Sequence, residues 1–88
     1  MVHQEVTVIN KLGLHARPAA LFVQTANKFA SDIMLEKGTK KINAKSIMGV
    51  MSLGVGKGEK IMIEVDGPDE SEALSALVNL IEVTLANM

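Results

Sequence analysis

The sequence predicts an α+β fold in which three helices cover one face of a mainly antiparallel four-stranded sheet. The first observation is periodicity: four segments alternate apolar and polar residues, and three others repeat apolar residues at intervals of three or four. The second is their order, strand–helix–strand–strand–helix–strand–helix, which is typical of the split βαβ arrangement. Because each predicted element has a single apolar face, helices on one side of the sheet bury these faces and leave the other side in water.

The first half of the chain accounts for three strands and one helix. Residues 2–9 alternate and predict a strand, which leads into a loop over residues 10–13. From Ala16 the spacing becomes helical, and we expect this helix to end between residues 27 and 30. Its apolar stripe comprises Ala19, Phe22, Val23, Ala26 and Phe29. Residues 32–44 predict two strands joined at Lys37-Gly38-Thr39, since a glycine suits a tight hairpin.

The second half predicts two helices and the fourth strand. The stretch "KSIMGVMSLG", residues 45–54, fits a short helix with Ser46 as its N-cap and Gly54 past its end. Residues 61–66 alternate and predict a strand. The last helix follows Pro68, and we expect Asp69 to cap it together with Glu72 in a capping box. Its buried stripe comprises Ala73, Leu74, Leu77, Leu80 and Ile81.

Length and composition narrow the class of protein. We interpret residues 1–88 as a single domain, because a chain of this length has no room for a second core. The absence of cysteine excludes disulfides and thiolate metal sites. The first ten residues lack the basic and apolar regions of a signal peptide, and no apolar run approaches the ~20 residues that cross a bilayer. We therefore expect a cytoplasmic protein with no membrane insertion.

The charge pattern argues against direct nucleic-acid binding. The formal net charge is −1, and the only aromatic residues are Phe22 and Phe29, whereas nucleic-acid binding needs a basic excess and usually aromatic stacking platforms. Six lysines nevertheless stand between residues 37 and 60, against the single acid Glu59. This segment is either a basic surface for an acidic partner or a set of scattered, solvated lysines.

The stretch "LGLHARPAA", residues 12–20, places His15 at or near the start of the first helix. The first amides of a helix have no internal partners and carry partial positive charge, so an anion beside His15 would find ready donors. The same charge favours the neutral, nucleophilic imidazole. Arg17 adds a cation whose planar fork suits phosphoryl oxygens. From these residues alone, His15 is either an ordinary polar residue at a helix start or a phosphoryl acceptor.

The residues around His15 fit the second possibility, and the rest of the chain offers no rival chemistry. Pro18 lies in the first turn, where its missing N–H costs nothing, and Ala16 and Ala20 are small enough to let a partner approach closely. We find no Ser-His-Asp set, no metal-ligand spacing, no cofactor motif and no Walker motif, since "GVGKG" at residues 54–58 lacks the required spacing. His3 has no supporting pattern and is interpreted as ordinary surface.

Two motifs, "GLHARPA" at residues 13–19 and "KSIMGVMSLG" at residues 45–54, resemble the histidine-containing phosphocarrier protein family HPr of the bacterial sugar phosphotransferase system. The resemblance covers the whole chain and implies an open-faced β-sandwich. It implies that His15 accepts a phosphoryl group on Nδ1 from phosphorylated enzyme I and passes it to IIA-type sugar permease proteins. Arg17 would steady the phosphoryl charge and Pro18 would shape the helix start. Such a protein is a covalent relay without turnover of its own, not an enzyme.

The second motif resembles the regulatory form of low-GC Gram-positive bacteria. There, Ser46 is phosphorylated by the HPr kinase/phosphorylase, and the product is a corepressor for catabolite control protein A in carbon catabolite repression. A phosphate at a helix N-cap meets free amides and is tolerated. If exposed, Ile47, Met48 and Met51 form a docking patch; the alternative is that Ser46 is a plain N-cap and the methionines are core.

The first motif departs from the family pattern at one position, and two rival functions compete with the phosphocarrier. Leu12 stands where the family often has a small polar residue, so a hydroxyl contact near the site is expected to be missing. A regulatory paralogue of the family carries Gln instead of the active histidine, so His15 favours the carrier. The first rival, which can coexist with the carrier function, is a regulatory binding module that acts mainly through phosphorylated Ser46. The second is a small-ligand regulatory domain, which needs a pocket that nothing in the sequence marks.

Overall fold

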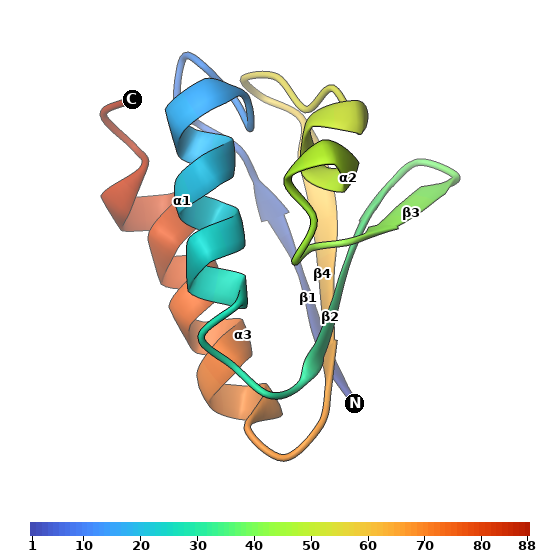
Figure 1. The fold of residues 1–88 in the computed structure, drawn as a ribbon. Coiled ribbons are helices and arrows are strands. Elements are labelled where there is room, and N and C mark those ends of the chain that lie inside the picture. Colours follow the sequence, from blue (N-terminus) through green and yellow to red (C-terminus); the bar gives the residue numbers. More distant parts are fainter.

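The computed structural model describes residues 1–88 and confirms the predicted order of elements (Figure 1). The chain runs through β1 (Val2–Thr7), α1 (Ala16–Ala26), β2 (Asp32–Lys37), β3 (Lys40–Asn43), α2 (Ile47–Ser52), β4 (Lys60–Asp66) and α3 (Glu70–Asn79). A π-helical turn, η1 (Leu80–Thr84), continues α3 and was not predicted. Helix α1 ends at Ala26, just before the range expected.

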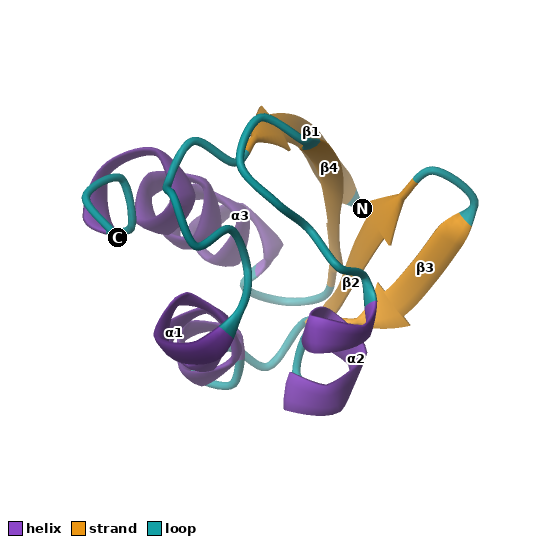
Figure 2. Ribbon diagram, turned by 90° about the horizontal axis from the view of Figure 1, so that it is seen from above, coloured by secondary structure: helices purple, strands orange, loops and turns teal.

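The sheet has the strand order β1-β4-β2-β3, and every pairing is antiparallel, where we predicted only a mainly antiparallel sheet. The helices all lie on one side of it, as Figure 2 shows, so the predicted fold class is confirmed. In β4 the residues Ile61, Ile63 and Val65 point into the core and are at most 1% exposed. The core is one cluster of 20 buried apolar residues, in which Phe22 is the largest fully buried side chain.

Strand β1 is shorter than the alternation of residues 2–9 predicts, because it ends at Thr7. Val8 is nevertheless fully buried, and its backbone still bonds to the loop before β4. The Val8 N–H donates to the Glu59 carbonyl at 2.9 Å, and the Gly58 N–H donates to the Val8 carbonyl at 2.7 Å. The apolar alternation therefore extends beyond the strand pairing, because Val8 is still buried after β1 ends at Thr7.

The predicted capping box at the start of α3 is wrong. Asp69 occupies the N-cap position, but its carboxylate makes no hydrogen bond to the helix. It accepts instead from the Ala30 N–H at 2.9 Å and from the Ser31 N–H at 3.0 Å and Oγ at 2.5 Å. Glu72 is exposed, and Glu70 accepts from the Gly67 N–H at 3.2 Å. Asp69 is thus a staple between the start of α3 and the loop before β2.

We expect Asp69→Asn to lower the midpoint of thermal unfolding by several degrees at neutral pH, and by less in acid. The Ser31 hydroxyl, followed by the Ala30 amide, lowers the pKa of Asp69. A folded-state pKa below the unfolded value makes the unfolded chain bind more protons, so this stabilisation is complete above the unfolded pKa and is lost as the pH falls through the folded one. Thermal melts between about pH 7 and pH 3 test this, because the stabilisation by the Asp69 carboxylate is expected to be lost below about pH 4.

A matched control for this prediction is Asp32→Asn, which alters an exposed carboxylate that makes no hydrogen bond or ion pair. Its melting midpoint should follow that of the wild type at every pH. If Asp69→Asn and Asp32→Asn give the same acid dependence, the staple does not contribute to stability.

Candidate functional site

His15 is the N-cap residue of α1, as predicted, and its side chain is exposed. Its backbone is extended (φ −124°, ψ 160°), and the imidazole makes no capping hydrogen bond. N-cap side chains normally accept from the helix backbone, so this ring is not occupied in holding the helix. Both ring nitrogens therefore remain available for chemistry with a partner.

The backbone behind His15 offers several free donors. The amide N–H groups of His15, Ala16 and Arg17 donate to no group of the protein, and Pro18 has none. The first helical hydrogen bond is long, from the Ala19 N–H to the His15 carbonyl at 3.5 Å. Free amides and the positive end of the helix dipole together favour an anion at this end of α1.

The loop that presents His15 is held against the chain between α2 and β4. Gly13 has φ +62°, and its Cα position faces the Val55 carbonyl so closely that a Cβ there would lie 2.2 Å from that oxygen. The following residue, Leu14, is fully buried, and its N–H donates to the Val55 carbonyl at 3.0 Å. Glu59 braces this supporting loop, because its carboxylate accepts from the Gly56 N–H at 2.7 Å and pairs with Lys37 at 2.9 Å.

The residue after the histidine is strained. Ala16 has φ +50°, and no other non-glycine residue of the chain has a positive φ. Nothing in the local sequence signals this, because alanine usually favours the right-handed helical region. Such strain is typical of functional sites, where the surrounding structure holds a conformation that the residue alone avoids.

We expect Ala16→Gly to stabilise the protein by about 1 kcal/mol, since glycine adopts a positive φ without steric cost. Urea unfolding of the two proteins measures the difference. The matched control is Ala20→Gly, one turn further along α1, where an ordinary helical position should lose about 1 kcal/mol. A loss of stability in both variants would show that Ala16 stores no strain.

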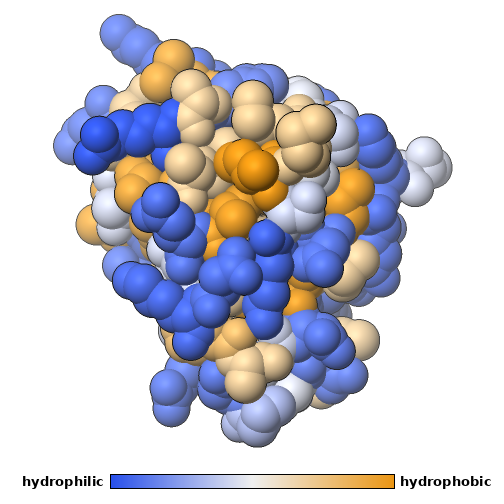
Figure 3. Space-filling view, viewed as in Figure 1, coloured by the Kyte–Doolittle hydropathy of each residue, from blue (hydrophilic) through white to orange (hydrophobic).

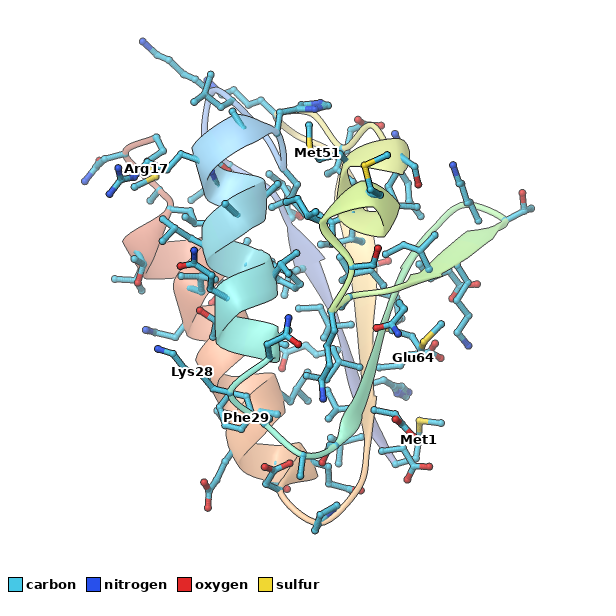
Figure 4. All side chains as sticks on the ribbon, viewed as in Figure 1. Met1, Arg17, Lys28, Phe29, Met51 and Glu64 are labelled. Atoms are coloured by element: carbon cyan, nitrogen blue, oxygen red, sulfur yellow. The ribbon has the colours of Figure 1, made fainter.

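The other residues of the first motif divide into an exposed and a buried set. Arg17 is exposed and makes no hydrogen bond or ion pair, and Figure 4 shows its side chain extended on the side of the C-terminal segment. No hydrogen bond or ion pair holds the guanidinium, so it is free to turn. Pro18 is buried in the first turn of α1. Leu12 is half exposed, and its N–H donates to the Met88 carbonyl at 3.3 Å.

Ser46 is the N-cap residue of α2, which confirms the predicted position. Its Oγ accepts from the Gly49 N–H at 3.1 Å and is half-buried. The residue before it is tied to the far end of α1: the Lys45 ammonium donates to the Phe29 carbonyl at 2.7 Å, and the Lys45 carbonyl accepts from Asn27 Nδ2 at 3.2 Å. These bonds fix where Ser46 lies relative to α1.

Apolar side chains of α2 are exposed beside the start of α1. The exposed fractions are 38% for Ile47, 78% for Met48 and 42% for Met51, while Val50 faces the core. On α1, Ala16 is exposed and Ala20 half-buried. We call these five residues the docking patch: Ala16, Ala20, Ile47, Met48 and Met51. Figure 3 shows an apolar area over the upper parts of α1 and α2, and Figure 4 shows Met51 at the end of the molecule where α1 begins.

Several lysines of residues 37–60 are engaged in contacts within the protein. Lys37 and Lys40 bond to carbonyls at the C-terminal end of α2, at 3.0 Å to Gly54 and 2.9 Å to Ser52 respectively, where a cation suits the helix dipole. Lys41 lies on the opposite face of the sheet and pairs with Glu64 at 2.6 Å. This arrangement favours separate structural roles over a single docking surface.

The remaining surface contributes little to the site. A hollow of about 330 Å³ lies on the open face of the sheet, where Met34, Lys41 and Glu64 are among its lining, and no residue of the two motifs lines it except Lys45. No group of three or more His, Asp or Glu side chains could hold a metal ion. No helix has the length and apolar character needed to span a bilayer.

Comparison with known proteins agrees with this fold. Residues 2–83 match the family described as "PTS HPr component phosphorylation site". The chain is 57% identical over 82 residues to the HPr-like protein Crh of Halalkalibacterium halodurans, covering 93% of this chain and 98% of that one. It is 52% identical over 82 residues to the phosphocarrier protein HPr of Treponema pallidum, covering 93% of each.

Solved structures give the same result. HPr-C-His from Thermoanaerobacter tengcongensis superposes with a TM-score of 0.96 at 56% identity, covering 100% of this chain and 99% of that one. HPr from Bacillus anthracis superposes with a TM-score of 0.90 at 54% identity, covering 92% and 96%. The class that these solved structures share with the chain is a small protein with three helices on one face of an open antiparallel sheet. The chain belongs to the HPr family of phosphocarrier and HPr-like proteins.

Proposed function

We propose that this protein is a phosphocarrier that accepts a phosphoryl group on His15 from phosphorylated enzyme I and hands it to IIA-type sugar permease proteins. The observation that carries the proposal is the environment of His15: an exposed imidazole without a hydrogen-bond partner, beside three consecutive unpartnered amides, its own and those of Ala16 and Arg17. Family membership supports the same function. The protein is a relay, because one phosphoryl group enters and the same group leaves at the same atom.

The geometry supports a simple transfer step. The lone pair of His15 Nδ1 attacks phosphorus, the Nδ1–P bond forms, and the bond from phosphorus to the donor breaks with its electrons returning to the donor. Three phosphoryl oxygens then lie near the amides of Ala16 and Arg17, which are free to donate. The Arg17 guanidinium, held by no other contact, is free to turn toward them. The same amides and guanidinium donate to the phosphoryl oxygens when the group is transferred from His15 to a IIA-type protein.

Incubation with enzyme I and phosphoenolpyruvate tests this function. Intact mass spectrometry should show a gain of one phosphoryl group, which is lost on brief acid treatment as expected of phosphohistidine. The gain should be absent in His15→Ala and present in His3→Ala, where the altered histidine is exposed in β1. An acid-stable adduct, or one that persists in His15→Ala, would contradict the proposal.

A second, compatible function is regulation through Ser46. The specific observation is that an N-cap hydroxyl adjoins three exposed apolar residues of the docking patch, and the amides of Ile47 and Met48 donate to no group. We propose that the HPr kinase/phosphorylase transfers the γ-phosphoryl group of ATP to Ser46 Oγ, with loss of the hydroxyl proton. The product then binds catabolite control protein A in carbon catabolite repression. A solved structure of the Bacillus subtilis relative Crh, 55% identical to this chain, is described as that of a catabolite repression HPr, which supports a role in catabolite repression.

Binding of the kinase-treated protein to catabolite control protein A tests the second function. Ser46→Ala should abolish both the ATP-dependent phosphorylation and the repressor binding. The matched control is Ser52→Ala in the same helix, whose Oγ only donates to the Gly49 carbonyl and which should leave both unchanged. Repressor binding by the Ser46→Ala protein would rule out this mechanism. Normal acceptance at His15 in that variant would show that the two functions are separable.

A further inference from the structure

We propose that Asn10 is a positioning residue for the phosphoryl-acceptor site, which acts by fixing the peptide plane between Gly13 and Leu14. The proposal rests on the proposed function of His15. Asn10 lies outside both motifs, in the loop between β1 and α1, five residues before the histidine. It is only 1% exposed, and apart from Ser31 it is the only buried polar residue of the chain.

Asn10 holds Gly13 through two contacts. Its side-chain Nδ2 donates to the Gly13 carbonyl at 2.9 Å, and its own backbone carbonyl accepts from the Gly13 N–H at 3.2 Å. Its Oδ1 is buried and accepts from no group of the protein. A buried amide that leaves part of its hydrogen-bonding capacity unused is unfavourable for folding. The one hydrogen bond that the Asn10 side chain makes within the protein is therefore the bond to Gly13.

This bond completes the fixation of one peptide unit. The Gly13–Leu14 peptide is held at its carbonyl by Asn10 and at its N–H by the Val55 carbonyl, 3.0 Å away. The next three amides along the chain, those of His15, Ala16 and Arg17, have no partner. Their orientation is therefore set by the plane that precedes them.

Loss of the Asn10 side-chain amide would leave the carbonyl of the Gly13–Leu14 peptide without its hydrogen bond. The Gly13 backbone, with φ +62°, could then rotate, and the imidazole and the free amides would move together. Transfer rates fall steeply when reacting groups are misplaced by a fraction of an ångström to an ångström. Asn10 is buried and belongs to no part of the docking patch, so the change should affect the transfer step and leave docking intact.

Kinetics and NMR of Asn10→Ala and Asn10→Asp test the proposal. Asp has the same shape, but its carboxylate cannot donate to the Gly13 carbonyl. We expect kcat for phosphorylation by enzyme I to fall about tenfold or more in both variants, with KM changed by less than about twofold. The amide resonances of Ala16 and Arg17 should shift in the unphosphorylated protein.

Two control variants separate positioning from simple loss of stability. Asn79→Ala removes an exposed amide without a hydrogen bond at the end of α3, and should change neither kcat nor these resonances. Asp69→Asn removes the staple and should lower stability with wild-type kcat.

If Asn10→Ala also keeps the wild-type kcat and undisturbed Ala16 and Arg17 amides, the proposal is overturned. If wild-type protein takes no phosphoryl group, the proposed function fails, and the NMR comparison alone decides the role of Asn10.

Discussion

Gly13→Ala should destabilise the protein by about 3 kcal/mol or more and abolish acceptance of a phosphoryl group at temperatures near the lowered transition. The added Cβ would lie 2.2 Å from the Val55 carbonyl oxygen and 2.8 Å from Gly56 Cα, so two backbone segments must separate. The φ of +62° is also sterically unfavourable for alanine, which has a Cβ. Both effects act on the contact that supports Leu14 and His15. A fall in the melting midpoint of roughly 15 °C is expected.

Gly38→Ala separates the two causes. Gly38 has φ +61° in the β2–β3 turn, but a Cβ there meets nothing within 4 Å. It should therefore cost only about 1 kcal/mol, from the backbone conformation. Thermal melts of the two variants give the comparison. Equal losses would show that the close contact between Gly13 and the Val55–Gly56 segment contributes nothing.

Met48→Asp should raise the KM of enzyme I for this protein about tenfold or more, with little change in stability. Met48 is 78% exposed, so no core packing is lost. At an interface, however, the substitution would bury an unpaired carboxylate in an apolar contact, which costs a factor of ten or more in affinity. Steady-state phosphorylation kinetics measure the effect.

Val83→Asp is the matched control for this docking prediction. Val83 is 63% exposed in η1, and Figures 1 and 2 both place the C-terminal segment on the far side of α1 from α2. The same change from an apolar residue to Asp should leave KM unchanged there. Met48→Leu should also behave as wild type, because the patch stays apolar. An unchanged KM in Met48→Asp would exclude Met48 from the interface with enzyme I.

Periodicity predicted the fold because it depends on side chains close in sequence. The alternation in β4 and the stripe of α1 correspond to buried faces in the structure. The capping box was predicted wrongly because the hydrogen-bond partner of Asp69 is distant in sequence. Asp69 has the spacing of a cap, but pairing of β2 with β4 brings Ser31 to it from 38 residues away. A local pattern cannot show which of two competing partners a carboxylate will accept from.

The same limit applies at the site. The helix-start positions of His15 and Ser46 follow from local rules for helix ends, and the structure confirms both. No local pattern indicates the positive φ of Ala16 or the burial of Asn10, which lie on either side of the contact that Gly13 and Leu14 make with the distant Val55. Whether Met51 is core or surface also depended on tertiary packing, and the structure places it on the surface.

A chase experiment tests the relay most directly. The protein is phosphorylated with enzyme I and labelled phosphoenolpyruvate, separated from both, and mixed with a IIA-type permease protein. We expect the label to leave His15 and to appear on the acceptor in stoichiometric amount, and we expect His15→Ala to carry no label at any stage. Label that never enters the protein, or that enters and is released only as inorganic phosphate when the acceptor is present, would contradict the relay.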